Sequence, residues 1–286
     1  MSAATIRNHP DAHDLDPTTM AHGPSRELLF QIFALLLAVI LVHALYVLWI
    51  RPEAAAAFAA EQAALAAGTA AAAQQSIFVI LKDYEQEAEL ILALWALAII
   101  AYKIRAGRFE QRLLERRLLP VDEGSRILPE DTRLLARPLE TLPPQEREAL
   151  PPRALRAGLR RFHATRNIQD TAATVGQLCD NEANRLDSEL AMIRYITWAI
   201  PSIGFIGTVR GIGMALSRAQ EAVGGDIAGV TASLGVAFNS TFVALVLSIV
   251  VMFFLHQLQL VQERLVLDTH NYCELHLVDR LKADGP

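Results

Sequence analysis

Four long apolar stretches divide the chain of 286 residues, at positions 27–50, 88–104, 191–216 and 227–256. A bilayer core is about 30 Å thick, and a helix needs about 20 mostly apolar residues to cross it. The second stretch, AELILALWALAIIAYKI, is the shortest, with Glu89 and Lys103 marking its ends. A run of that length also fits an interfacial or buried helix. The pattern predicts an all-α integral membrane protein with four transmembrane helices.

Lysine and arginine are concentrated between the second and third stretches. Residues 103–194 hold 17 of the 26 basic residues, whereas 51–89 holds two and 217–226 holds one. Basic residues accumulate on the cytoplasmic side of a membrane protein. We therefore place 1–26, 105–190 and 257–286 in the cytoplasm, and 51–87 and 217–226 in the periplasm.

The segments outside the membrane differ in composition. Residues 51–87 begin with an alanine-rich run, which fits either an amphipathic helix on the outer surface or a tolerated spacer. Residues 120–153 carry seven prolines, so short helices and extended links are expected there. A helical pattern over 154–193 should continue into the third span. The tail after residue 256 is also expected to be helical and to pack on that segment.

Composition excludes several classes of function. The net charge is −5, and no basic stripe interleaved with aromatic residues indicates nucleic-acid binding. Cys179 and Cys273 lie far apart in the sequence and are expected to be free thiols; no ligand spacing predicts a metal, and no cofactor is expected. Neither 195–217 nor 227–255 contains Asp, Glu, Lys or His. An intramembrane protease has no candidate residues, so we expect no enzyme, and any titrating group for protons should belong to a second protein.

The third span contains the unusual stretch PSIGFIGTVRGIG. Pro201 should bend the helix, and the carbonyl that it frees needs another partner. The glycines allow close helix packing; they are Gly204, Gly207, Gly211 and Gly213. Arg210 near mid-span costs about 2.5–3.5 kcal/mol on insertion scales. It either reaches the outer interface or lies at a pore mouth, paired with an acid such as Asp226 or one on a partner.

The fourth span carries SLGVAFNSTFVALVLS, in which small and hydroxyl residues recur every four positions. The two rows are Ser233, Ala237, Thr241 and Ser240, Ala244, Ser248. This spacing predicts a smooth face for another helix. Hydroxyl groups in membrane helices often bond to their own backbone. We interpret Thr208 and Thr241, supported by Ser240 and Asn239, as the polar lining of a pore.

These two motifs resemble the MotA/TolQ/ExbB proton-channel family. PSIGFIGTVRGI is similar to the family's P-x-L-G-x-x-G-T-V-x-G-I, and LGVAFNSTFVAL is similar to its A-L-x-(T/A)-T-x-x-G-L. The two motifs stand in the family's order and spacing within residues 195–258, and the rest of the chain is similar only in architecture.

The resemblance implies a homo-oligomer, a pentamer, in the lipid bilayer of a bacterial inner membrane. The pentamer would surround a dimer of a single-span partner of the MotB, TolR or ExbD type, whose transmembrane aspartate passes protons or sodium ions. It further implies that the glycines pack neighbouring subunits, that Pro201 shapes the pore helix and that Thr208 faces the partner aspartate.

The chain departs from the family pattern at several positions. Val236 stands where ExbB-like members have a glutamate, Ala244 replaces a glycine, and Arg210 replaces a bulky apolar residue. Four predicted spans match MotA, whereas TolQ and ExbB have three. The chain therefore cannot be assigned to one branch.

Two other functions remain open from the sequence. A non-conducting membrane scaffold could hold a complex through the proline-rich cytoplasmic segment. An autonomous small-solute transporter would function without a partner, but the missing intramembrane acids and internal repeats argue against it.

Overall fold

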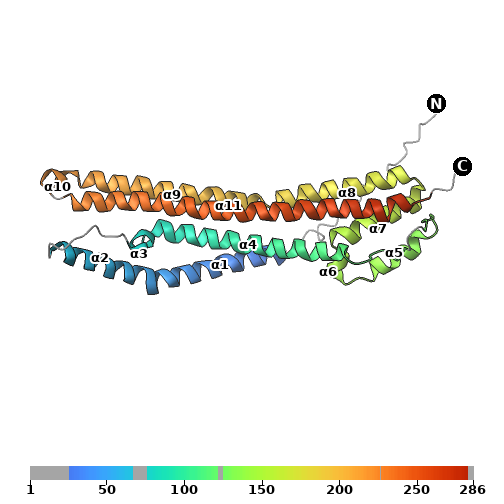
Figure 1. Ribbon diagram of the computed structural model, residues 1–286, viewed down its shortest axis with the longest axis horizontal. Helices are drawn as coiled ribbons and strands as arrows, with labels where there is room; N and C mark the ends of the chain where they lie inside the picture. The colour runs from blue at the N-terminus through green and yellow to red at the C-terminus, as the bar shows by residue number, and fades with distance from the viewer. Residues whose placement is uncertain (1–25, 67–75, 122–124, 226, 283–286) are drawn as a thin grey trace, which may run out of the picture.

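The computed structural model describes residues 26–66, 76–121, 125–225 and 227–282. The helices lie side by side along one long axis, with α5, α6 and α7 gathered at one end and α10 at the other (Figure 1). In the described part of the chain, four helices are long and apolar enough to cross a membrane. These are Glu27–Ala60, Tyr84–Leu114, Ile168–Ser217 and Ala228–Arg280. The predicted all-helical membrane architecture is therefore confirmed.

The first helix continues far beyond its predicted end at residue 50. Helix α1 (Arg26–Leu45) passes through one π-helical turn, η2 (Tyr46–Ile50), into α2 (Arg51–Ala66). The wider turn lies just before Pro52, whose ring and missing N–H disturb the preceding helical turn. Alanine favours the helix that follows. Residues 51–66 thus extend the first helix, while the rest of the alanine-rich run, 67–75, lies outside the described residues.

The second apolar helix is longer than the stretch that predicted it. After the short α3 (Ile77–Leu81), α4 runs from Tyr84 to Leu114 and includes both Glu89 and Lys103, which we expected to mark the ends of the second span. At its other side, Lys103 is buried and contacts Glu27 at 2.6 Å and Glu189 at 2.7 Å. This buried lysine ties three helices together, because a desolvated charge needs close counter-charges.

The proline-rich segment forms short helices and links, as its composition predicts. Helices α5 (Thr132–Glu140) and α6 (Pro144–Arg147) are separated by turns. A hairpin of α7 (Leu150–Thr165) and α8 (Ile168–Ser188) follows, instead of one continuous helix over 154–193. The chain reverses where Arg166 adopts φ 51° and the Asn167 side chain accepts a hydrogen bond from the Asp170 amide at 3.2 Å. The prediction missed this break because Arg166 is not a glycine, the usual residue in a left-handed cap.

Helices α9 (Ala191–Ser217) and α11 (Ala228–His276) make the most extensive contact between helices in the described part of the chain, and α10 (Ala219–Val223) lies between them in the sequence. The far end of α11 packs on α8, and the turn η3 (Val278–Arg280) ends the described fold. Leu258, Leu265 and Cys273 are buried along this end of α11. The helical tail expected from the sequence is therefore present. Cys179 and Cys273 are free and buried in the same apolar cluster, although they are far apart in the sequence.

Pro201 lies inside α9 without ending the helix. Its missing N–H frees the carbonyl of Thr197, four residues earlier. The hydroxyl of Ser248 on α11 donates to that carbonyl at 3.4 Å. The neighbouring helix thus satisfies the backbone group that the proline leaves free, as a helix in lipid requires.

The glycines of α9 face α11 of the same chain. Gly204, Gly207 and Gly211 are buried, and a Cβ atom at Gly211 would lie 2.6 Å from the Ala237 amide nitrogen and 2.8 Å from the Ser233 carbonyl oxygen. A Cβ atom at Gly204 would meet Ala244, and one at Gly207 would meet Ser240. The resemblance implied that these glycines pack neighbouring subunits, whereas the structure places the three against α11 within one subunit.

Gly213 offers a matched control for this packing, because a Cβ atom there would meet nothing within 4 Å. We expect Gly211→Ala to destabilise the fold by about 1–3 kcal/mol, since backbone atoms of α11 must move. Gly213→Ala should be neutral or stabilising by up to about 1 kcal/mol through helix propensity. Thermal unfolding of the two purified variants in detergent measures the difference. Equal melting temperatures would contradict the close approach of α9 and α11.

Candidate ion pathway at the contact of α9, α11 and α4

Thr208 on α9 and Thr241 on α11 meet at the helix contact. Their hydroxyl groups hydrogen-bond to each other. Thr208 Oγ1 lies 3.1 Å from the Ala237 carbonyl oxygen and 3.3 Å from that of Gly204, and Thr241 Oγ1 lies 3.2 Å from the Gly204 carbonyl oxygen. Two hydroxyl groups supply two protons to these four oxygen atoms, so acceptor lone pairs remain. The cluster therefore suits a water molecule or a cation.

The other polar residues of the α11 motif have different surroundings. Ser240 is fully buried against Gly207, and its hydroxyl has no hydrogen-bond partner among the described residues. Asn239, at the position before Ser240, is half-buried. Ala237 and Ala244 are buried in the same helix contact and have the packing role expected from their spacing. The structure thus brings Thr208, Thr241 and the small residues together.

Arg210 pairs with α4 of its own chain. Its guanidinium group contacts both carboxylate oxygens of Glu85 at 2.7 Å, Nε with Oε1 and a terminal nitrogen with Oε2, and it lies 3.9 Å from Asp83. Burial raises the pKa of Asp83, while the charges of Lys82 and Arg210 oppose that rise. Asp226, the partner considered from the sequence, lies outside the described residues. Arg210 therefore joins the C-terminal half of α9 to the start of α4.

Acidic residues that the sequence placed outside the second span or at its end lie inside the first turns of α4. Glu87 contacts Arg51 and His43, each at 2.6 Å. Glu89 is fully buried, and neither carboxylate oxygen has a partner in the described part of the chain. The available signal was the spacing of Glu85, Glu89 and Ala93, which lie four residues apart and continue one helix face. Extending the α4 pattern backward would have brought these acids into the helix.

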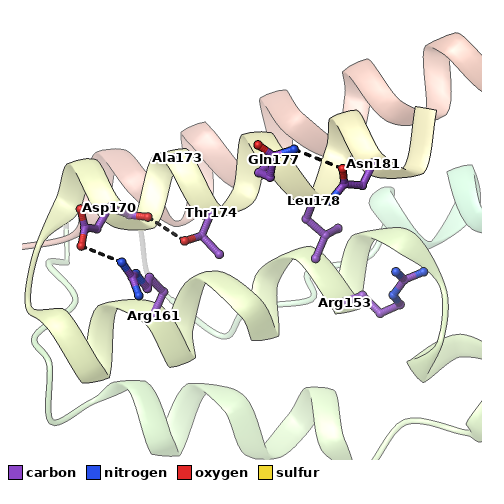
Figure 2. Close-up of a pocket in the computed structure, with 8 residues that line it drawn as sticks. All are labelled: Arg153, Arg161, Asp170, Ala173, Thr174, Gln177, Leu178 and Asn181. Atoms are coloured by element: carbon purple, nitrogen blue, oxygen red, sulfur yellow. Dashed lines mark hydrogen bonds and ion pairs between the residues drawn. The ribbon is translucent and has the colours of Figure 1, made fainter. Parts of the chain in front are cut away.

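A shallow groove between α7 and α8 lies away from this contact (Figure 2). Its polar side chains are engaged with neighbours: Arg161 contacts Asp170 at 3.0 Å, and Gln177 donates to Asn181 at 3.1 Å. On its other side, Arg153 contacts Glu182 at 3.3 Å. The groove therefore belongs to the packing of the hairpin.

The Arg210–Glu85 contact allows a double-mutant test. Arg210→Gln and Glu85→Gln should each lower the melting temperature of the purified protein. The first leaves the largely buried Glu85 carboxylate without its partner, and the second removes both contacts that join Arg210 to α4. The double variant should lose less than the sum, with a coupling of about 0.5–3 kcal/mol. Additive losses would show that the two helices are not held by this pair. Glu53→Gln, at an exposed position of α2, is the control and should have no effect.

Part of the chain matches a known protein family. Residues 146–271 match the MotA/TolQ/ExbB proton channel family. The match includes α7, α8, α9 and most of α11, hence both threonines and the glycine face, whereas α4 lies outside it. No curated protein and no solved structure matches the chain. The match over residues 146–271 therefore supports membership of the MotA/TolQ/ExbB proton channel family.

Proposed function

We propose that this chain is the channel-forming subunit of an ion-driven complex in a bacterial inner membrane. It passes protons, or sodium ions, and couples the motive force to mechanical work by a partner. The chain acts as a pentamer, with 1–26, 105–190 and 257–286 in the cytoplasm. The partner is a single-span protein of the MotB, TolR or ExbD type, with an aspartate inside the membrane.

The observation that carries this proposal is the oxygen cluster of Thr208 and Thr241. The cluster lies inside the segment that matches the family, between two helices that are each long enough to cross a membrane. Hydroxyl and carbonyl oxygens replace part of the hydration shell of a passing cation or order the water that conducts a proton. No side chain of this cluster titrates near neutral pH, so the transferable proton must be held elsewhere.

Exposed apolar faces on α9 and α11 support assembly with further chains. Phe205 and Ile206 on α9 and Phe238 and Phe242 on α11 are each at least 61% exposed in the isolated chain. These faces need lipid or other helices around them. In the proposed assembly, they contact neighbouring subunits and the partner helices, and the partner aspartate lies opposite Thr208 and Thr241.

Arg210 has a supporting role in this proposal. Its contact with Glu85 fixes α4 against α9 just outside the hydroxyl cluster. We assign it as an anchor of the outer mouth, which keeps a positive charge off the ion pathway by pairing it within the subunit.

The proposal predicts a specific effect of Thr241. With the full chain and its partner in proteoliposomes, Thr241→Ala should lower ion flux by about tenfold, because the hydrogen bond lost in the pathway raises the barrier by about 1.4 kcal/mol. Thr241→Ser keeps the hydroxyl and should retain flux. A pH-sensitive dye inside the vesicles measures protons, and a sodium-sensitive dye measures sodium ions.

Assembly is the control for this experiment, and size-exclusion chromatography should give the same complex for all three proteins. Unchanged flux in an intact Thr241→Ala complex would contradict the proposed pathway. Absence of any flux in the native complex would favour a scaffold.

A further inference from the structure

Four buried polar side chains at the start of α4 and on its neighbours have atoms without hydrogen-bond partners in the described residues. Each of the four is 0% exposed: Tyr46, Gln86, Glu89 and Ser240. The partnerless atoms are the Tyr46 and Ser240 hydroxyl oxygens, both amide atoms of Gln86 and both carboxylate oxygens of Glu89. Buried polar groups are normally satisfied, so each exception needs an explanation. Here the exceptions occur together.

Contacts between the helices bring these groups to one region. The Cγ atom of Glu85 lies 3.2 Å from the position of a Cβ atom on Gly207, which adjoins Ser240. Glu89 follows Glu85 by one turn on the same face of α4, and Gln86 precedes Glu89 by three residues, a spacing that also brings two side chains to neighbouring positions on a helix. From η2, Tyr46 packs against Leu90 and Ile91 of α4, the residues that directly follow Glu89. The region is therefore bounded by η2, α4, α9 and α11.

The charged groups around Glu89 contact one another, although Asp83 shares Arg210 with Glu85 and has one buried carboxylate oxygen, Oδ2, without a partner in the described residues. Glu85 contacts Arg210 of α9, which also lies 3.9 Å from Asp83. Glu87 contacts both Arg51 and His43 of the first helix. Lys82 lies beside Asp83 in the chain, and α11 has no titratable residue between 228 and 255. Glu89 is thus left without a basic partner among the described residues.

The burial of Glu89 comes from its own chain. Helix α4 packs on α1, α9 and α11, and the apolar cluster around Ala93, Ala96 and Ala244 begins one turn deeper. Addition of subunits or a partner cannot return to water a group that one chain already encloses. An ionised carboxylate without a counter-charge is costly there, so it must bind a cation or take up a proton.

The available donors match a single positive charge. One carboxylate supplies one negative charge, and the amide oxygen of Gln86 and the hydroxyl oxygens of Tyr46 and Ser240 are neutral donors. Oxygen donors of this kind bind hard cations. A divalent ion would keep an uncompensated charge in this apolar surrounding, whereas a proton or Na⁺ would not.

We propose that Glu89, with Gln86, Tyr46 and Ser240, forms a monovalent-cation site inside each subunit, in which the Glu89 carboxylate holds a proton or Na⁺. This site adjoins the Thr208–Thr241 cluster through Ser240, which directly precedes Thr241 on α11, whereas its other three residues lie on η2 and α4. Its carboxylate can hold an exchangeable ion within the subunit, whereas the spanning parts of α9 and α11 contain no carboxylate. Its contribution to ion passage rests on the channel function proposed above, but its occupancy does not.

Reaction with a membrane-permeant carbodiimide tests this occupancy on the full chain in its native complex. Carbodiimides modify protonated carboxyl groups, and peptide mass spectrometry locates the adduct. We expect an adduct at Glu89 that declines as pH is raised. Glu87 is the internal control and should remain unmodified, because Arg51 and His43 each contact its carboxylate oxygens at 2.6 Å and leave no free oxygen for the reagent. Glu89→Gln, which preserves the shape of the side chain, should remove the adduct.

Repeating the carbodiimide reaction in sodium and in choline salts distinguishes a bound Na⁺ from a bound proton. Protection of Glu89 by Na⁺ at constant ionic strength, compared with choline, identifies a sodium site. Dependence on pH without Na⁺ protection identifies a proton site. Infrared difference spectra of the same samples report the protonated carboxyl group without any reagent, and the Glu89→Gln variant assigns its band.

Two results would overturn the inference. One is the absence of both the adduct and the assigned infrared band at every pH and salt. The other is equal modification of Glu89 and Glu87. The flux assay separates this failure from that of the proposed function. Flux that depends on Thr241, without a protonated or Na⁺-protected Glu89, would contradict the cation site but not the channel function. An occupied Glu89 in a complex without flux would contradict the channel function but not the cation site.

Discussion

The close approach of α9 and α11 is the contact on which the rest of the structure depends. Apolar packing between helices gains little in lipid, so backbone contact through small residues must replace it. Gly204, Gly207 and Gly211 on one helix and Ala237 and Ala244 on the other allow this approach. The same approach brings the Thr208 and Thr241 hydroxyl groups together and lets Ser248 satisfy the carbonyl freed by proline.

A third helix, α4, packs on this pair and supplies charged contacts around it. Near the start of α4, Glu85 contacts Arg210. Further along the helix, Lys103 contacts Glu27 and Glu189. Charged contacts therefore hold α4 on both sides of its apolar segment. Between these contacts lie Glu89 and then the small residues Ala93 and Ala96. The apolar middle of the bundle is thus held in register by polar contacts, and Glu89 is the acid of this arrangement left without a partner in the described residues.

The sequence predicted most of the fold and only part of the candidate site. Apolar runs gave four helices, because length and composition suffice for that inference. The motif around Thr208 and Thr241 was local enough to recognise, and its spacing implied the contact with another helix. Arg210 and Glu85 are separated by 125 residues, so no local pattern could pair them. The α7–α8 reversal depends on a left-handed arginine, and the depth of Glu89 depends on where α4 begins.

The central claim is that this chain forms a channel with a partner that carries the transmembrane aspartate. Native mass spectrometry of the complex, extracted gently from its own membrane, tests it most directly. We expect a pentamer of this chain that holds two copies of a small single-span protein with an aspartate inside its span. A monomer, or an assembly without such a protein, would contradict the claim.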